Sequence, residues 1–246
     1  MRLNTNTAKS RLNEKHYQKE LFKYKLKHWF ESMNTLRLAN YIDVGLTEVK
    51  EDGVIECAMD RYADSLFEYA KDPEVGPIAG WPPHRSREES LDVIRNVLNG
   101  RECYAICEKG NPKAIGAIEL ILNRHNDTEN HDEECELGYW NKTKRDDECE
   151  LGYWLGQPFW GRGYMPEAAR EMIRHGFEDL GMNTIWCGYF EGNQKSKRVQ
   201  EKIGFVYHHT REKVSVPLMK EVRTEHRNIM TKERWMAERE KNCGKV

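Results

Sequence analysis

The spacing of apolar and polar residues along the chain predicts a domain built from both strands and helices. Short apolar runs bounded by turn residues predict strands at residues 54–58, 102–108, 114–122, 149–155, 184–190, 205–216 and 225–230. Helical spacing predicts helices at residues 64–71, 86–98, 166–180 and 195–203, and a last helix after Thr231. This order of elements indicates an α+β domain around a mixed sheet.

A segment with many prolines and glycines interrupts the pattern after the first predicted helix. Residues 73–84 contain four prolines and two glycines, so we expect a shaped loop and no helix there. Trp81 and His84 belong to this loop and are candidates for binding the substrate. In the alternative interpretation, Trp81 packs the loop and His84 is a surface residue.

A seven-residue sequence, ECELGYW, occurs at residues 134–140 and again at residues 148–154. Two adjacent copies indicate a tandem duplication, because a repeat architecture needs several stacked units. The second copy leads directly into a glycine-rich segment, whereas the first copy lies one repeat length further away. We therefore expect the second copy to form a central strand and residues 124–147 to form a duplicated acidic insertion.

The glycine-rich segment contains Gly161 and Gly163 and precedes a predicted helix with Pro166 in its first turn. Proline is tolerated at that point because the first N–H groups of a helix have no intrahelical partner. A glycine-rich turn that enters a helix exposes several backbone N–H groups pointing one way, which is an arrangement that binds phosphate. The sequence therefore predicts a pyrophosphate site at residues 159–164.

The composition is typical of a soluble protein with reduced cysteines, and we expect a cytoplasmic location. Lys and Arg number 39 against 41 Asp and Glu, so neither a nucleic acid nor a membrane is the expected partner. No run approaches the roughly 18 apolar residues of a membrane span, and no apolar signal segment begins the chain. The seven cysteines show no C-x-x-C spacing. No metal is expected, because His125, His131 and Cys135 match no established ligand spacing.

Residues 1–50 are expected to form a basic helical extension to a domain at residues 51–240. Residues 1–30 hold eight Lys or Arg against two Glu, a local charge of 8 − 2 = +6. An imperfect apolar stripe predicts a helix over residues 13–33. We interpret it as a helix packed on the domain. The alternative is a basic arm that binds RNA or an acidic partner.

Two segments resemble the central motifs of the GNAT superfamily of N-acetyltransferases. They are ELGYWLGQPFWGRGYMPEAAREMI at residues 150–173 and FEGNQKSKRVQEKIGF at residues 190–205. The resemblance extends over residues 54–235 and points to the RimJ/RimL-like branch, which acetylates the N-terminal amines of proteins. It implies a mixed, mostly antiparallel central sheet that is split between two parallel strands, with helices on both faces.

The resemblance implies that acetyl-CoA, the acetyl donor, lies in this split. Its pantetheine arm would pair with the strand at residues 149–155, and its pyrophosphate would lie on the glycine loop, where glycine lets the backbone approach closely. Arg162 either adds charge to that loop or is simply an exposed arginine. The residues expected to contact the donor are Tyr153, Trp154, Leu155, Gly161, Arg162, Gly163, Tyr164, Asn193 and Ser196.

The resemblance also implies candidates for handling the leaving thiol. Many family members carry a tyrosine seven residues after the motif asparagine, here Asn193, and it gives a proton to the departing sulfur. Gln200 stands at that position and has no such proton to give. The RimJ/RimL branch usually has a serine instead, here Ser196. This serine either hydrogen-bonds the sulfur or caps a helix.

The incoming amine must be neutral, so the reaction needs a base. Glu150 resembles the family's glutamate and is the first candidate, and Glu119 on the preceding predicted strand is the second. In the alternative interpretation, Glu150 is a solvated carboxylate at the end of a strand. A strand N–H, that of Tyr153 or Trp154, would stabilise the oxyanion.

These features predict an acetyl-CoA-dependent N-acetyltransferase, an acyltransferase that moves an acetyl group to a primary amine by direct attack. The expected acceptor is a protein N-terminus or a small-molecule amine, and the expected state is a monomer or a homodimer. Two alternatives remain open. One is a non-catalytic acyl-CoA-binding protein, and the other is a ribosome- or RNA-associated module that uses the basic N-terminal arm.

Overall fold

The computed structural model describes residues 36–40, 48–49, 55–56, 58–98, 100, 102–109, 111, 113–122 and 146–243. The predicted N-terminal helix at residues 13–33 and the first ECELGYW copy lie outside these residues. His125, His131 and Cys135 lie outside them as well. Among the described helices, none is long and apolar enough to cross a membrane.

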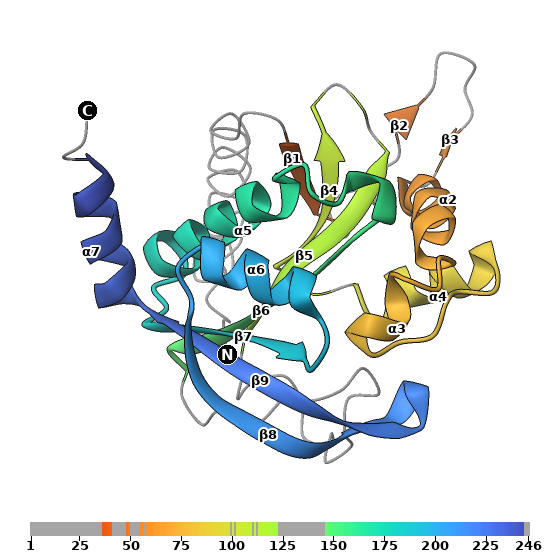
Figure 1. Cartoon of the computed structure of the whole chain (residues 1–246). Coiled ribbons are helices and arrows are strands. Elements are labelled where there is room, and N and C mark those ends of the chain that lie inside the picture. Colours follow the sequence, from red (N-terminus) through yellow and green to blue (C-terminus); the bar gives the residue numbers. More distant parts are fainter. Residues whose placement is uncertain are drawn as a thin grey trace, which may run out of the picture.

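Seven of the described strands form one open sheet in the order β1-β4-β5-β6-β7-β9-β8 (Figure 1). Their bounds are Leu36–Asn40 (β1), Cys103–Glu108 (β4), Ala114–Leu122 (β5), Glu148–Leu155 (β6), Thr184–Phe190 (β7), Val206–Val216 (β8) and Glu221–Thr231 (β9). Neighbouring strands in this sheet are antiparallel except for β6 and β7, which are parallel. A separate pair joins β2 (Glu48–Val49) to β3 (Ile55–Glu56). The predicted α+β fold with a mixed, mostly antiparallel sheet is confirmed.

The second ECELGYW copy forms most of β6, in the middle of the sheet, as its position next to the glycine loop predicts. Its alternate residues divide between the two faces of the sheet. Cys149 and Leu151 are buried in the larger apolar core, whereas Trp154 also packs against the smaller core on the opposite face. A strand buried on both faces needs apolar residues at nearly every position, which explains the apolar and aromatic character of this segment.

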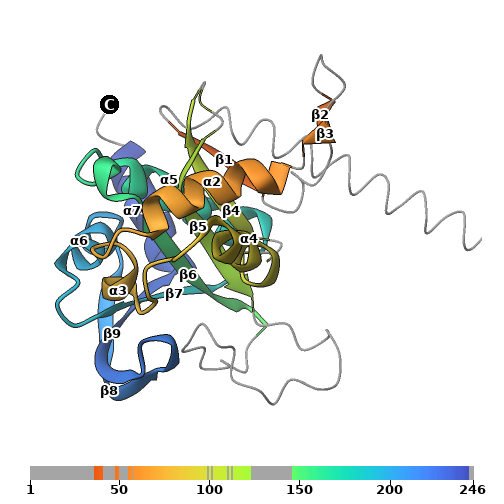
Figure 2. The same ribbon diagram turned by 90° about the vertical axis from the view of Figure 1, so that its right-hand side faces the viewer.

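Helices cover both faces of the sheet, which confirms the predicted layers. The helices α2 (Ala58–Ala70), α3 (Gly76–Ala79) and α4 (Arg87–Asn96) group at one side of the molecule, and α7 (Lys232–Cys243) lies at the opposite side (Figure 1). Figure 2, turned so that this group faces the viewer, shows α2 and α4 in front of β4 and β5. The other layer contains α5 (Tyr164–Arg174) and α6 (Gln194–Lys202).

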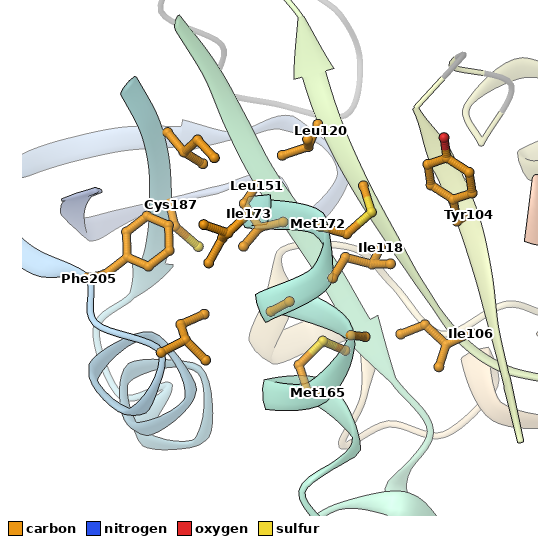
Figure 3. Packing of buried hydrophobic residues seen from close by; sticks show 14 of the residues in the cluster. Tyr104, Ile106, Ile118, Leu120, Leu151, Met165, Met172, Ile173, Cys187 and Phe205 are labelled. Carbon is orange, nitrogen blue, oxygen red and sulfur yellow. The ribbon is translucent and has the colours of Figure 1, made fainter. Parts of the chain in front are cut away.

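The larger core lies between α5 and the sheet. Met165, Met172 and Ile173 of α5 are at most 5% exposed and pack with buried residues of the strands, among them Ile118 and Leu151 (Figure 3). Such spacing places residues of one helical face against the sheet. This packing fixes α5 relative to β6, and therefore fixes the turn that connects them.

Two predictions about the first third of the domain are wrong. The segment at residues 73–84 is not purely a loop, because Gly76–Ala79 forms the short helix α3. Pro77 is compatible with its first turn, and Gly80 ends it in a left-handed conformation with φ +100°. Of the predicted strand at residues 54–58, Ile55–Glu56 forms β3, residues 54 and 57 lie outside the described residues, and Ala58 belongs to helix α2, which starts there and not at residue 64.

Strands β1 and β2 were not predicted, and β1 pairs with β4 in the main sheet although residues 1–50 were expected to form a helical extension. The predicted helices and strands from α4 onward agree with the structure to within a few residues. The Oγ of Ser86 accepts a hydrogen bond from the N–H of Glu89, so Ser86 caps α4 as expected. Thr231 likewise accepts from the N–H of Arg234 at the start of α7. The predicted helix at residues 166–180 begins two residues early as α5 and continues as a π-helical turn, His175–Asp179.

Candidate functional site

The parallel pair β6–β7 separates partway along its length. Its ladder contains only three pairs, and the last of them joins Glu150 to Trp186. Both strands continue beyond this pair, β6 to Leu155 and β7 to Phe190. The facing edges of the two strands therefore diverge into a split, as the sequence motifs imply.

The backbone of Tyr153 faces this split. The N–H and C=O of one residue in a strand point to the same neighbouring strand, and those of the next residue point to the strand on the other side. The C=O of Asp147 accepts from the N–H of Asn183, before β7, whereas the N–H of Gly156 donates to Ile115 of β5. Odd-numbered residues of β6 therefore direct their backbone groups toward β7. Of the two candidates for the oxyanion, the N–H of Tyr153 faces the split and that of Trp154 faces β5.

The glycine loop follows β6 and ends at the N-terminus of α5. Gly161 and Gly163 have φ values of +76° and +84°, which favour glycine. A Cβ atom built at either position meets no atom within 4 Å, so the space in front of the loop is open. Within the described residues, no side chain caps the N-terminus of α5. Its first N–H groups and its dipole are thus directed at this open space.

One cavity of about 410 Å³ connects the loop to the split. Eight of the nine residues predicted to contact acetyl-CoA line it, and the exception is Arg162, whose guanidinium lies 5.4 Å from the centre of the Phe159 ring. The walls also include residues outside these nine. These are Val75, Ile78, Ala79, Phe159, Trp160, Met165, Pro166, Lys195, Arg198, Val199 and Lys202.

Trp160 joins the two parts of the cavity. Its indole N–H donates to the C=O of Leu155, the last residue of β6, at 2.7 Å. The ammonium group of Lys195 lies 3.5 Å from the centre of the Trp160 ring, a cation–π contact. With Arg198 and Lys202, Lys195 makes the α6 wall of the cavity cationic. A polyanion next to the glycine loop would therefore meet positive charge on two sides.

The second motif forms the turn into α6. The Oδ1 of Asn193 accepts from the N–H of Ser196, so Asn193 and not Ser196 caps this helix. The Oγ of Ser196 lies 3.0 Å from the hydroxyl of Tyr153 and 3.1 Å from Nε2 of Gln200. The alternative role of Ser196 as a simple cap is thus not what its side chain does.

Gln200, at the position of the family tyrosine, is fully buried. Its Nε2 donates to the C=O of Gly188 on β7, and its Oε1 accepts from Asn228 on β9 at 2.7 Å. These bonds join α6 to two strands of the sheet. Because both its donor and its acceptor are hydrogen-bonded, this buried amide costs the folded state little free energy, and it orients the groups that it contacts.

The first candidate base, Glu150, lies in a buried ion pair. Its two carboxylate oxygens accept from the two terminal nitrogens of Arg227 at 2.5 and 2.7 Å. Arg227 also contacts Glu225, and that carboxylate contacts Arg211. Burial raises the pKa of Glu150, and the hydrogen bonds from Arg227 oppose that rise.

The second candidate base, Glu119, occupies a different environment. It pairs with Gly152 across the β5–β6 ladder, so its side chain shares a face with Glu150. A Cβ atom at Gly152 would lie 3.3 Å from Oε1 of Glu119, so the glycine leaves room for this carboxylate. Burial raises the pKa of Glu119 to about 7, and the charge of Glu150 contributes to the rise.

Trp81 and His84, the candidates for substrate binding, lie beside the cavity and not in its walls. The ring of Trp81 meets that of Trp154, a wall residue, edge to face at a centroid distance of 6.1 Å. The Nδ1 of His84 lies 2.8 Å from the Oγ of Ser90, and burial lowers the pKa of His84. Trp81 therefore contacts the cavity through Trp154, whereas His84 is attached to α4.

Comparison with known proteins gives consistent results. The family model described as "Acetyltransferase (GNAT) domain" matches residues 58–206, which is more than half of the chain. YdaF from Bacillus subtilis (strain 168), whose name describes a ribosomal N-acetyltransferase, is 39% identical over 91 residues. That match covers 37% of this chain and 42% of YdaF, so the chain spans less than half of this relative's length.

Solved structures share the fold. An acetyltransferase of the GNAT family from Bacillus anthracis has a TM-score of 0.56 at 17% identity, over 82% of this chain and 98% of that one. The microcin C7 self-immunity acetyltransferase MccE, solved with acetyl-CoA and AMP, has a TM-score of 0.55 at 14% identity, over 80% of this chain and 93% of that one. Together with the split sheet, the glycine loop and the match to the family model, these similarities show that the chain belongs to the GNAT acetyltransferase family.

Proposed function

We propose that the protein is an acetyl-CoA-dependent N-acetyltransferase of the RimJ/RimL-like type, which transfers acetyl to a primary amine by direct attack. One observation carries the proposal. A single cavity runs from a glycine loop at a helix N-terminus to the split between β6 and β7. An elongated ligand with a phosphate at one end and a reactive group at the other fits such a cavity. The name of YdaF, which describes a ribosomal N-acetyltransferase, supports a ribosomal acceptor.

The donor would be held mainly by the backbone. The N–H groups of residues 161–164 and the cations of α6 would bind the pyrophosphate, because both supply positive potential. The pantetheine arm would hydrogen-bond the odd-numbered residues of β6 that face the split. Phe159 and Trp160 contribute aromatic rings to the apolar part of the cavity wall. The N–H of Tyr153 would stabilise the oxyanion that forms when the amine attacks.

Glu119 is the base that the geometry favours. Both oxygens of Glu150 are engaged by Arg227, and releasing either would leave a buried cation with fewer partners. Glu119 has the pKa of a base matched to neutral pH. Both carboxylates lie on the face of β6 opposite to the side chain of Tyr153. Neither carboxylate lines the cavity itself, so the amine would reach Glu119 from the side of the sheet opposite to Tyr153.

Thiol release from acetyl-CoA, followed with a panel of peptides and small amines, tests the proposal. We expect release that depends on the amine and saturates with at least one member of the panel. Tight CoA binding without acetylation of any amine would instead support the non-catalytic acyl-CoA-binding protein. Removal of residues 1–35, which leaves strand β1 in the sheet, tests the RNA- or ribosome-associated alternative, which requires partner binding to be lost with that segment.

A further inference from the structure

A chain of four hydrogen-bonding side chains extends from β9 to the cavity. Asn228 donates to Gln200, the Nε2 of Gln200 lies 3.1 Å from the Oγ of Ser196, and that Oγ lies 3.0 Å from the hydroxyl of Tyr153. Asn228 and Gln200 are buried, at 4% and 0% exposure. Ser196 and Tyr153 both line the cavity. The chain therefore begins in the interior and ends at the split.

The two amides fix the direction of this chain. The Oε1 of Gln200 accepts from Asn228, so its Nε2 must face the C=O of Gly188 and the Oγ of Ser196. An amide nitrogen is only a donor, so Ser196 accepts at this contact and keeps its own O–H to donate. At the contact with Tyr153 either hydroxyl can be the donor. In the arrangement in which Ser196 donates, the O–H of Tyr153 is the last donor in the series.

Few groups compete for the hydroxyl proton of Tyr153. Its other contacts in the described residues are the C=O of Ser196, at 3.4 Å, which is longer than a typical O–H···O bond, and the side chains of Gln200 and Cys187. The titratable group that faces it from β7 is the thiol of Cys187. Burial raises the pKa of Tyr153 well above its usual value, so the hydroxyl stays protonated at neutral pH.

Building on the proposed function, we propose that Tyr153 is the catalytic residue that donates a proton to the departing CoA sulfur. In this role it replaces the tyrosine that many family members carry at the position of Gln200. Ser196 and Gln200 act as positioning residues in this proposal, because Ser196 contacts the Tyr153 hydroxyl and Gln200 contacts Ser196. A phenol contributed by β6 thus takes the place of one contributed by α6.

The amine nitrogen attacks the thioester carbon, and Glu119 takes the proton that the nitrogen loses. When the tetrahedral intermediate collapses, the C–S bond breaks and sulfur keeps the electron pair. Tyr153 gives its proton to that sulfur to form the thiol. Solvent in the cavity returns a proton to the phenolate, and Glu119 releases one to solvent, so both residues are regenerated.

The test compares Tyr153→Phe with the wild type under saturating acetyl-CoA. We expect kcat to fall about 100-fold or more, in the range that general acids contribute, while KM for acetyl-CoA changes less than threefold. Tyr104→Phe is the matched control, because it removes another buried hydroxyl, bonded to Glu102, and should leave kcat unchanged. A Tyr153→Phe variant that keeps at least a third of the wild-type kcat overturns the proposal.

A second readout separates proton donation from a structural role. A polyfluorinated tyrosine at position 153 keeps the shape of the side chain but has a more acidic phenol. We expect kcat of this variant to fall as pH rises through the lowered pKa, because only the protonated phenol can donate. The same pH profile in the variant and the wild type overturns the proposal. If the wild type transfers no acetyl group to any amine, the proposed function fails first.

Ser196→Ala and Gln200→Leu test the positioning residues. Both should lower kcat by less than Tyr153→Phe does, because each leaves the phenol in place but removes its orientation. In the background of Tyr153→Phe, either change should have little further effect on kcat. Full additivity of the losses would show that Ser196 or Gln200 acts independently of Tyr153, which contradicts the proposed chain.

Discussion

Arg227 binds both carboxylate oxygens of Glu150 across two strands that are separated by 77 positions in the sequence. Glu150 lies at the last pair of the β6–β7 ladder, so this ion pair is located where the split begins. Arg227 is 6% exposed, and its guanidinium also lies 5.9 Å from the ring centre of Trp186, the ladder partner of Glu150. The ion pair therefore connects β9 to β6 next to β7 and stabilises the start of the split.

Glu150→Gln should therefore affect stability more than chemistry. Glutamine retains the shape but not the charge, and Arg227 keeps only Glu225 as an ionic partner. We expect the free energy of unfolding to fall by about 1–3 kcal/mol and kcat to fall less than tenfold. Urea denaturation and amine-dependent thiol release measure the two effects. A loss of 100-fold or more in kcat at unchanged stability would identify Glu150 as the base.

Glu119→Gln should remove the general base of the reaction. With a weakly basic acceptor amine, which stays neutral across the range, kcat/KM of the wild type should rise with pH and level off above about 7. This rise should be absent in the variant, and the kcat of the variant should be at least about 100-fold below that of the wild type. An acidic limb that persists in Glu119→Gln would assign the base to another group.

The same carboxyl group predicts a pH dependence of stability. Its pKa is raised on folding from 4.5 to about 7, so the folded state holds the proton more tightly. The contribution of Glu119 to stability is then fully present below pH 4.5 and is lost as pH rises through about 7. Unfolding free energies of the wild type and Glu119→Gln, measured between pH 5 and 8, should differ by an amount that falls in this direction. A difference that is constant across this range would contradict the raised pKa.

Gly161→Ala should weaken donor binding through the backbone. An alanine at φ +76° costs about 1–2 kcal/mol if the loop keeps its shape, and relaxation would turn the N–H groups away from the phosphate. We expect the Kd for CoA to rise at least tenfold. Gly181→Ala is the matched control, because Gly181 has φ +73° and an equally open Cβ position but lies outside the cavity walls. An equal rise in Kd for both variants would show a general loss of stability.

Deletion of residues 141–154 tests the assignment of the duplicated strand. It removes one repeat length and leaves a single ECELGYW sequence adjoining Leu155, which is the arrangement of β6 in the structure. The shortened protein should fold and bind acetyl-CoA with a similar Kd. Thermal unfolding and calorimetric titration measure both properties. A large drop in Tm would show that both copies contribute to the fold.

The sequence was sufficient to predict the elements whose signals are local. The strands of the central sheet other than β1, the glycine loop, the capping of α4 by Ser86 and the placement of the second ECELGYW copy all depend on neighbouring residues. Strand β1 was missed because its segment was expected to be a helical extension. The short helix α3 was missed because prolines and glycines normally break helices, although Pro77 and Gly80 here occupy the two positions where each is tolerated. Because α3 was not predicted, Ile78 and Ala79 of this helix were not recognised as part of the cavity wall.

The site residues that sequence patterns did not identify depend on contacts between distant segments. Glu150 was the first candidate base because no motif indicates that Arg227 binds it. In the sequence, Gln200 was notable only because it replaces the family tyrosine. Its hydrogen-bond partners Gly188 and Asn228 lie on β7 and β9, far from it in the sequence. The contact between Ser196 and Tyr153 spans 43 positions. Such pairings follow from the register of the sheet and the position of α6, which local patterns do not specify.

Transfer of a labelled acetyl group tests directly whether the protein acetylates an amine without a covalent intermediate. The protein is incubated with acetyl-CoA labelled in the acetyl group and with a peptide that has a free N-terminal amine or a small primary amine, and the label is then located. We expect the label to move from CoA to the amine nitrogen in a reaction that requires the amine, and we expect no label to remain on the protein. Label bound covalently to the protein, or retained entirely on CoA with every amine tested, would contradict it.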